Sequence, residues 1–251
     1  MDSLSPHNPL VKEVRRAVSR GTLTEDGYAV AEGAHLLAEA RGAGCEVLAV
    51  IARESAAAQF PEARVVSDRL FGELASTETP QGVLALVRPP AWTLEQTMTG
   101  QTLVVVLDGV QDPGNAGAIL RAAEAFGATG AVFLKGTVNP YNPKCMRGSA
   151  GSVFRLPLVA GVEPDAFLAA APASVIACLY AAMPRARRLV SEVDLAAPCA
   201  IVIGSEARGV RAEMAARATG VRIPTSGVES LNAAVAAGIL LYEARRQRGG
   251  S

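Results

Sequence analysis

Three short segments of the chain combine polar side chains with glycines in patterns that could hold a small ligand. The first contains Asn115 and, six residues later, Arg121. A guanidinium such as that of Arg121 can donate paired hydrogen bonds to a phosphate or a carboxylate. The second segment places Glu206 two residues after Gly204. Glu206 is either a favourable charge before a helix or a carboxylate that lines a pocket.

The third segment runs from Ile223 through the loop Thr225–Gly227 into a helix predicted to start near Ser230. Ser230 and Asn232 lie where backbone N–H groups lack helical partners, which suits either a helix cap or a bound ligand. The small residues of the stretch 233–238 keep one side of this helix thin. Alone, the segment is compatible with an ordinary capped loop and a helix-packing face. The other two segments favour a ligand site.

Each of these segments follows a predicted strand, namely Thr102–Leu107, Ala200–Ile203 and Val221–Ile223. Strand and helix patterns alternate along the whole chain, which predicts an α/β fold with helices that cover a mostly parallel sheet. Ligands of parallel α/β sheets gather at the carboxyl ends of the strands, so the three segments are expected to meet there. Two further strands are predicted at Val153–Leu158 and Val175–Leu179.

The segment Arg88–Gly100, RPPAWTLEQTMTG, has two prolines and little periodicity, which predicts a linker between two domains. We therefore expect an N-terminal domain over residues 1–88, a linker over 89–100 and a larger C-terminal domain over 101–251.

The composition narrows the classes of function. Among 251 residues, 24 Lys and Arg balance 24 Asp and Glu, so any contact with nucleic acid must come from local basic patches. The aromatic content of 4% argues against many stacked bases. Four scattered cysteines without a CxxC, together with only two histidines, argue against a zinc site and fit reduced thiols in the cytoplasm. Pro172 interrupts the longest uncharged stretch, residues 166–183, so we expect no membrane span.

Several enzyme classes lack their motifs in this chain. There is no GK[ST] and no GxGxxG, so neither ATP nor a nicotinamide dinucleotide is indicated. The serines Ser149 and Ser205 miss the G-x-S-x-G pattern of a hydrolase. Neither histidine lies near the three glycine-bearing segments, so a Ser–His or Cys–His nucleophile has little support.

Together these segments resemble the three ordered motifs of the SpoU (TrmH) family of RNA 2′-O-ribose methyltransferases, in the SPOUT superfamily. The matching stretches are DPGNAGAILRAAEAFGA (Asp112–Ala128), IVIGSEARGV (Ile201–Val210) and IPTSGVESLNAAVAAGILLYE (Ile223–Glu243). YNPKCMRGSAGSVFRLP (Tyr141–Pro157) is similar to an intermediate block, and TETPQGVLALV (Thr77–Val87) to part of a substrate-binding extension. The chain departs mildly, with Thr225 where an apolar residue is frequent and Ala-Ala at 233–234 in place of Val-Ser.

The resemblance implies a C-terminal SPOUT domain with a trefoil knot and a smaller N-terminal α/β domain similar to ribosomal proteins. It implies S-adenosylmethionine as methyl donor, structured RNA as substrate, a homodimer, and no metal. Carried over residue by residue, the catalytic positions are Asn115, Arg121, Glu206, Ser230 and Asn232. The positions that would contact the donor are Gly204, Ile223, Leu231 and Leu179.

RNA would be held by basic patches rather than by a global field. The candidates are Lys12, Arg15, Arg16 and Arg20 in the helical pattern of residues 8–20, with Lys144, Arg147 and Arg155 in the intermediate block. The residues of the first patch are equally compatible with a solvent-exposed helix face that binds no RNA. Arg185, Arg187 and Arg188 are expected to be solvated in a surface loop, and Arg245, Arg246 and Arg248 to form a small basic tail.

Methyl transfer to a ribose oxygen needs mainly positioning and help for the departing proton. A guanidinium is protonated at ordinary pH, so we expect Arg121 to fix a phosphate and stabilise a developing alkoxide. The group that takes the proton stays open. The alternative function is a non-catalytic RNA-binding or ribosome-assembly factor on the same fold. The N-terminal extension favours rRNA over tRNA by analogy, and neither the target nucleotide nor a housekeeping or resistance role follows from the residues.

Overall fold

The computed structural model describes residues 4–249, which divide into two compact units. Unit 1 comprises residues 1–91 and 139–155, and unit 2 comprises residues 92–138 and 156–251, each within the described range. Asn139–Arg155 therefore packs with the first unit, although it lies inside the range predicted for the C-terminal domain. The range 89–100 contains a short helix, α4 (Leu94–Thr97), capped by Thr93. The domain boundaries inferred from the sequence stay a prediction.

Unit 1 is built on a four-stranded sheet with the order β1-β4-β2-β3, in which only the β2–β3 pair is parallel. Its strands are β1 (Ala29–Glu32), β2 (Glu46–Arg53), β3 (Arg64–Val66) and β4 (Val83–Arg88). Its helices are α1 (Pro9–Arg20), α2 (Ala34–Gly42), α3 (Asp68–Leu74), the 3₁₀ helix η1 (Glu54–Gln59), α6 (Pro143–Ser149) and α7 (Ser152–Arg155). Val11, Val14 and Ala17 bury one side of α1 against the sheet.

Unit 2 contains a seven-stranded sheet with the order β7-β6-β5-β10-β8-β11-β9, and the strand pairs are parallel. Its strands are β5 (Leu103–Asp108), β6 (Gly130–Leu134), β7 (Leu158–Val162), β8 (Leu179–Ala182), β9 (Arg188–Leu189), β10 (Cys199–Gly204) and β11 (Thr219–Arg222). Its remaining helices are α5 (Pro113–Ala125), α8 (Pro164–Ala170), α9 (Ala173–Ala177), the 3₁₀ turn η2 (Val190–Glu192), α10 (Ala212–Ala215) and α11 (Ala233–Gln247).

The strand order of unit 2 reverses next to β5. The chain runs outward from β5 through β6 to β7, then crosses to the other half of the sheet, and β10 later inserts between β5 and β8. Asp108 and Gly204 are paired at the carboxyl ends of β5 and β10. Such a reversal opens a crevice at the strand ends, which is where ligands of parallel α/β sheets bind.

Two predicted strands are helical in the structure. The stretch Val153–Leu158 begins in α7 and reaches β7 only at its last residue. Val175–Leu179 likewise covers the end of α9 and the first residue of β8. Both are short apolar runs, and periodicity alone does not separate a buried strand from a buried helical turn. Within residues 4–249, no helix is long and apolar enough to cross a membrane.

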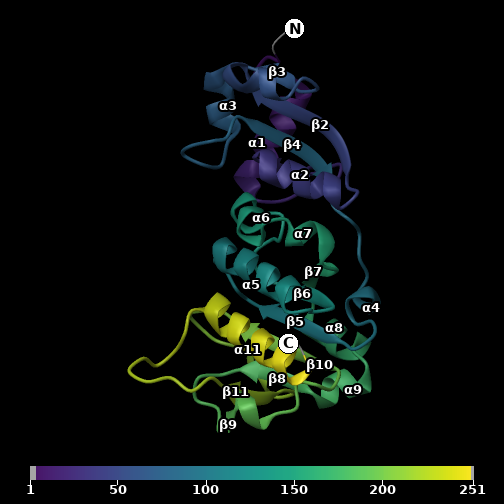
Figure 1. Ribbon diagram of the computed structural model, residues 1–251, viewed down its shortest axis with the longest axis vertical. Helices are drawn as coiled ribbons and strands as arrows, with labels where there is room; N and C mark the ends of the chain where they lie inside the picture. The colour runs from purple at the N-terminus through teal and green to yellow at the C-terminus, as the bar shows by residue number, and fades with distance from the viewer. Residues whose placement is uncertain (1–3, 250–251) are drawn as a thin grey trace. The chain divides into compact units, whose positions relative to one another are not determined.

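Helix α11 packs against α5, and Figure 1 shows the two side by side in yellow and teal. The loop that precedes α11 extends outward from unit 2 in the same view, and residues 224–230 are exposed. At the other end of α11, the Arg248 guanidinium donates four hydrogen bonds of 2.7–2.9 Å to the carbonyl oxygens of Gln101, Thr102, Leu195 and Ala197. Arg246 pairs with Glu243, so two of the three arginines expected in a basic tail are engaged by the protein itself.

Candidate active site

The loop after β5 turns into α5 through a side-chain cap. Asp112 accepts a 2.7 Å hydrogen bond from the backbone N–H of Asn115, and Pro113 occupies the first helical position, where no N–H is needed. Asn115 is therefore the third residue of α5, with its backbone fixed by the cap. This leaves its side-chain amide available for contacts across the crevice.

The side chains of three sequence-distant residues join at this point. Asn115 donates from Nδ2 to Oε1 of Glu206 at 2.6 Å. Asn232 in turn donates from Nδ2 to Oδ1 of Asn115 at 3.0 Å. The structure thus brings together one residue from each of the three predicted motifs. The Glu206 carboxylate can only accept hydrogen bonds when ionised, so it fixes the orientation of the Asn115 amide and hence of the Asn232 amide.

Asn232 has a second task as the N-cap of α11. Its Oδ1 accepts hydrogen bonds from the backbone N–H groups of Ala234 (2.9 Å) and Val235 (3.3 Å). The helix therefore starts at Ala233 and not near Ser230, because asparagine is as good a cap as serine and lies next to the buried, helix-favouring alanine. Ser230 instead remains exposed in the loop.

A cavity of about 900 Å³ lies beside this linked trio in unit 2. Its walls come from the loops after β8, β10 and β11 and from the first turns of α11. Gly204, Ile223 and Leu231, three of the four residues predicted to contact a donor, line it, as do Glu206 and Ser230. Leu179 does not: it is buried in β8 as part of the hydrophobic core.

The loop after β10 folds back on itself so tightly that only glycine fits at its start. A Cβ at position 204 would lie 2.2 Å from both the Gly209 carbonyl carbon and the Val210 nitrogen. Ser205 and Gly209 close the turn with two backbone hydrogen bonds of 3.1 and 2.8 Å. The result is a compact wall of backbone groups with few bulky side chains. This suits a ligand such as S-adenosylmethionine, which combines a flat adenine with a polar amino-acid end.

An ion pair that the sequence analysis missed holds the far end of this loop. Asp108 is buried at the end of β5 and accepts a 2.7 Å hydrogen bond from the backbone N–H of Arg211, while the Arg211 side chain pairs with its other oxygen. Arg211 also donates to the Lys135 carbonyl at 3.0 Å. Asp108 directly follows a buried strand and precedes the first motif, a position that could have marked it as a candidate.

Arg121 is not part of the linked trio. It is exposed on α5 and does not line the cavity. Six residues correspond to about 600° of helical rotation, which turns Arg121 roughly 120° away from Asn115 around the helix axis. Its neighbours on that side, Ala118 and Ala125, are also small and exposed.

The arginines predicted to bind RNA on α1 are paired with carboxylates of the same unit. Arg15 lies 3.0 Å from Glu73, and Arg16 contacts both Glu13 and Glu25. These pairs reduce the positive field that the helical pattern suggested. Lys12 is exposed on the same helix. The RNA-binding role of this strip stays a prediction.

The intermediate block places its cations against unit 1. Arg147 donates a 2.5 Å hydrogen bond to Ser76 Oγ and lies 3.7 Å from the buried carboxylate of Glu32. Arg155 likewise pairs with Glu39 of α2. Lys144 lies in the first turn of α6 and is exposed. Arg147 and Arg155 therefore also hold the block against the sheet and α2 of unit 1.

The cysteines contribute no nucleophile to the site. All four are free thiols. Burial raises the pKa of the Cys145 thiol to about 12 and that of Cys199 to about 11, so both remain protonated at neutral pH.

The parallel sheet with its reversed strand order and the three loops that converge beside a cavity agree with the fold of the SPOUT methyltransferases to which the chain is similar. The chain belongs to the SpoU rRNA methylase family, whose model matches residues 102–242. Residues 8–85 match a second model, the MRM3-like substrate binding domain. S-adenosylmethionine is the cofactor of this family, and the backbone cradle at Gly204 fits it.

Two relatives and a solved structure align over nearly the whole chain. It is 36% identical to an uncharacterised tRNA/rRNA methyltransferase of Synechocystis, covering 97% of this chain and 93% of that protein. It is 28% identical to the 23S rRNA (guanosine(2553)-2′-O)-methyltransferase RlmP of Bacillus subtilis, covering 96% of this chain and 98% of that protein. The crystal structure of the SpoU methyltransferase AviRb from Streptomyces viridochromogenes with AdoMet aligns at a TM-score of 0.86 and 28% identity, covering 98% of this chain and 100% of that one.

Substitutions can separate the two roles of Asn232, namely the N-cap of α11 and the hydrogen bond to Asn115. Asn232→Ser retains an N-cap but cannot reach Asn115, whereas Asn232→Ala loses both contacts. We expect Asn232→Ala to lower the free energy of unfolding by about 1 kcal/mol and Asn232→Ser to lower it by a few tenths. Both are expected to lower the methylation rate by a similar factor, measured with labelled donor. A Ser variant with wild-type activity would show that only the cap matters.

Proposed function

We propose that this protein transfers a methyl group from S-adenosylmethionine to a ribose 2′-hydroxyl of ribosomal RNA. The observation that carries the proposal is the hydrogen-bonded link from Asn232 through Asn115 to Glu206, which joins the three motif loops beside the cavity. The named relatives support the substrate class, since RlmP is a 23S rRNA guanosine 2′-O-methyltransferase. The N-terminal match to a substrate-binding domain is a second support for RNA.

The donor would lie against the backbone of the loop after β10 and against Ile223 and Leu231. When bound, S-adenosylmethionine supplies an electrophilic methyl group on a positively charged sulfur. The residues of the chain bind it chiefly through backbone groups, since Gly204 and Gly209 permit close approach.

The polar residues of the site position the ribose. Asn115 is held rigid by Glu206 and Asn232, so its amide presents a fixed dipole at the edge of the crevice. Ser230 lines the cavity and has a hydroxyl that can donate to or accept from the sugar. Arg121 lies outside the cavity of its own chain, so its proposed role begins when RNA is bound: it fixes a phosphate next to the target and stabilises the charge that develops on the 2′-oxygen. Orientation of this kind can be worth about 7–11 kcal/mol of barrier.

The proposal is tested by incubating the protein with methyl-labelled donor and, separately, with rRNA and tRNA, followed by digestion to nucleosides. The expected product is a 2′-O-methylated nucleoside from rRNA. Label on a base would reject ribose as the target, and label only on tRNA would reject the substrate class. RNA binding without any donor binding in calorimetry would replace the enzyme by a non-catalytic RNA-binding factor.

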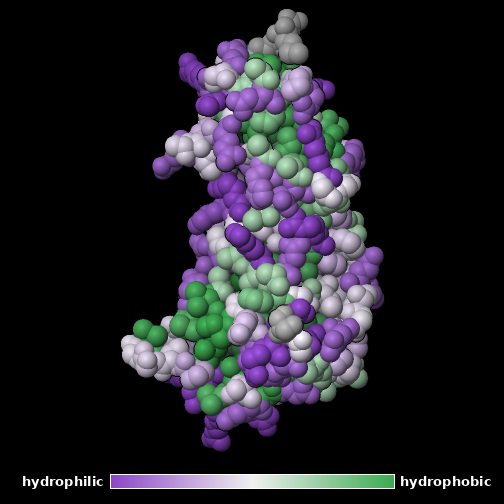
Figure 2. All heavy atoms as spheres, viewed as in Figure 1, coloured by the Kyte–Doolittle hydropathy of each residue, from purple (hydrophilic) through white to green (hydrophobic). Residues whose placement is uncertain are grey.

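We also propose that the working unit is a homodimer joined through α11. Val235, Ile239 and Tyr242 follow one side of this helix at helical spacing and are exposed, with Val228 in the adjoining loop. Figure 2 shows a hydrophobic patch in this region beside the extended loop. Exposed apolar side chains in a group of this kind mark interaction surfaces. Sedimentation equilibrium should give twice the mass of the 25.9 kDa chain, and a monomer at micromolar concentration would reject the dimer.

We further propose a division of labour between the two domains, a knotted C-terminal domain and a cytoplasmic location. Residues 1–88 would hold RNA, residues 101–251 would carry the reaction and thread a trefoil knot, and the protein would work in the cytoplasm. The parallel seven-stranded sheet and the second family match support this division. An experimental trace of the chain around α11 checks the knot, cell fractionation checks the location, and separate expression of the two ranges checks the boundaries.

A further inference from the structure

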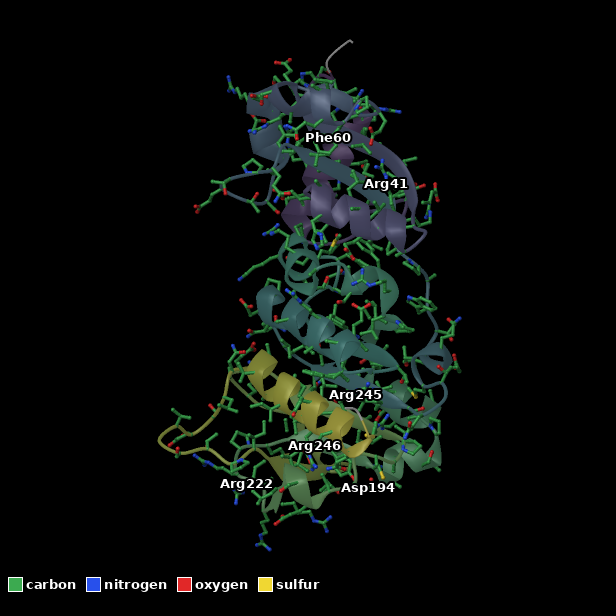
Figure 3. The ribbon with its side chains drawn as sticks, in the orientation of Figure 1. Arg41, Phe60, Asp194, Arg222, Arg245 and Arg246 are labelled. Atoms are coloured by element: carbon green, nitrogen blue, oxygen red, sulfur yellow. The ribbon has the colours of Figure 1, made fainter. Side chains whose placement is uncertain are left out.

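The mouth of the donor cavity is unusually basic for this neutral chain. Four arginines line the cavity, against only two carboxylates, those of Glu206 and Glu229. The four are Arg185, Arg187, Arg208 and Arg222. They come from two loops, after β8 and after β10, and from the last residue of β11, Arg222, which Figure 3 labels. We call these four residues the arginine rim.

Most of the positive charge of the rim is not neutralised by the protein. Among the described residues, Arg187, Arg208 and Arg222 have no carboxylate within ion-pair distance. Arg185 lies 3.8 Å from Glu229, and both side chains are 93% exposed, so this pair is weak and readily exchanged. The arginines of the α1 strip contrast with the rim, since Arg15 and Arg16 are held by neighbouring glutamates.

The methyl donor cannot account for this charge. S-adenosylmethionine has a sulfonium and an ammonium against a single carboxylate, so its net charge is positive. One arginine could bind that carboxylate, but the others would repel the ligand unless a polyanion were also present. Glu206 and Glu229 carry two negative charges against the four arginines, so the cavity mouth keeps a net positive charge. A second, strongly anionic ligand at the same mouth would balance that charge.

We propose that the arginine rim binds the phosphodiester backbone of the RNA strand that carries the target nucleotide. Guanidinium groups bind phosphate through paired donors, and such contacts set the register of a strand without reading its bases. The loop after β8, which holds Arg185 and Arg187, thereby becomes part of the RNA surface and not a merely solvated segment. This inference rests on the proposed function, because only that function identifies the bound strand as the RNA that is methylated.

The test compares paired substitutions that remove equal charge from unit 2. Arg185→Gln/Arg187→Gln removes two rim arginines. Arg217→Gln/Arg245→Gln removes two exposed arginines that do not line the cavity, and Arg185→Lys/Arg187→Lys retains the rim charge. The probe is a mixed-sequence single-stranded RNA oligonucleotide, titrated at several salt concentrations, and donor affinity is measured separately by calorimetry.

Each phosphate contact contributes about 0.7 to the slope of log affinity against log salt for a single strand, so losing two contacts should reduce the slope by about 1.4. The lysine variant should keep most of the slope, and the control pair should change it much less. Donor affinity should fall by no more than about twofold in all three, because the donor has a net positive charge and gains little attraction from the rim arginines. If the control pair reduced the salt slope as much as the rim pair does, the inference would be overturned. An unchanged salt slope in the rim pair would also overturn it.

A rim variant that lost donor affinity tenfold while its RNA slope stayed constant would assign the arginines to the donor and also overturn the inference. The proposed function fails in a different way, through absence of 2′-O-methylated product from the unmodified protein. If that product were absent while the slope still fell in the rim variant, the RNA surface would stand without the proposed reaction. If the product formed while the slope stayed constant, only the rim inference would be lost.

Discussion

Replacing Arg121 by alanine is expected to lower the rate of methyl transfer about 10²–10³-fold, the usual effect of removing one donor that stabilises a developing oxyanion. The side chain is exposed and stands among small residues of α5, so its removal takes away little packing. The melting temperature and the donor affinity should therefore stay close to those of the unmodified protein. Single-turnover kinetics with labelled donor and saturating RNA measures the rate of the chemical step.

Arg121→Lys is the matched control for this prediction. Lysine keeps the charge but not the planar fork of donors, so we expect a rate between those of arginine and alanine. A full rate in Arg121→Ala would falsify the catalytic assignment of Arg121. A large fall in melting temperature would instead assign the residue a structural role that its exposed position does not suggest.

Replacing Arg211 by alanine is expected to cost about 2–3 kcal/mol of stability, less than for a fully buried ion pair because the Arg211 side chain is 37% exposed. Asp108 has no exposed side-chain area, so its carboxylate would retain only the backbone N–H of residue 211 as a described partner. The loop between Gly204 and Arg211 would lose its anchor, and the donor affinity should fall as well. Urea denaturation and calorimetry with S-adenosylmethionine measure the two effects.

Two further variants test whether the Asp108–Arg211 ion pair causes this loss of stability. Arg217→Ala removes an exposed arginine that lies six residues later in the same unit, and should change stability by no more than about 0.5 kcal/mol. Adding Asp108→Ala to Arg211→Ala removes the stranded carboxylate and should restore part of the lost stability. Equal stability of Arg211→Ala and Arg217→Ala would mean that the ion pair does not hold the loop.

The site could be predicted from the sequence where short-range signals exist. Asp112 and Pro113 initiate α5, and Gly204 is the residue that a reversed loop requires, so the three segments were recognisable one by one. The hydrogen bonds that join the three segments could not be predicted from the sequence. Asn115 and Glu206 are 91 residues apart, and they meet because β10 inserts next to β5, an arrangement set by the whole sheet.

The charged side chains were the least predictable. A helical pattern identifies Arg15 and Arg16 as exposed cations, but it cannot reveal that Glu73 and Glu25 approach them from other segments. The same reasoning placed Arg185 and Arg187 in a solvated loop, because their position on a cavity wall depends on β8 and β11 being neighbours. Opposite charges that are distant in sequence leave no periodic signal.

The clamp formed by Arg248 bears on how the protein is made. Its guanidinium joins carbonyls from residues 101–102 and 195–197, so a residue at the end of α11 secures segments that the ribosome produced much earlier. Domains generally acquire their structure as units in the order of synthesis. The sheet of unit 2 can gain this closure only after residue 248 has left the ribosome and is free to reach it. Removal of residue 248 would abolish this closure while leaving every motif of the site in the chain.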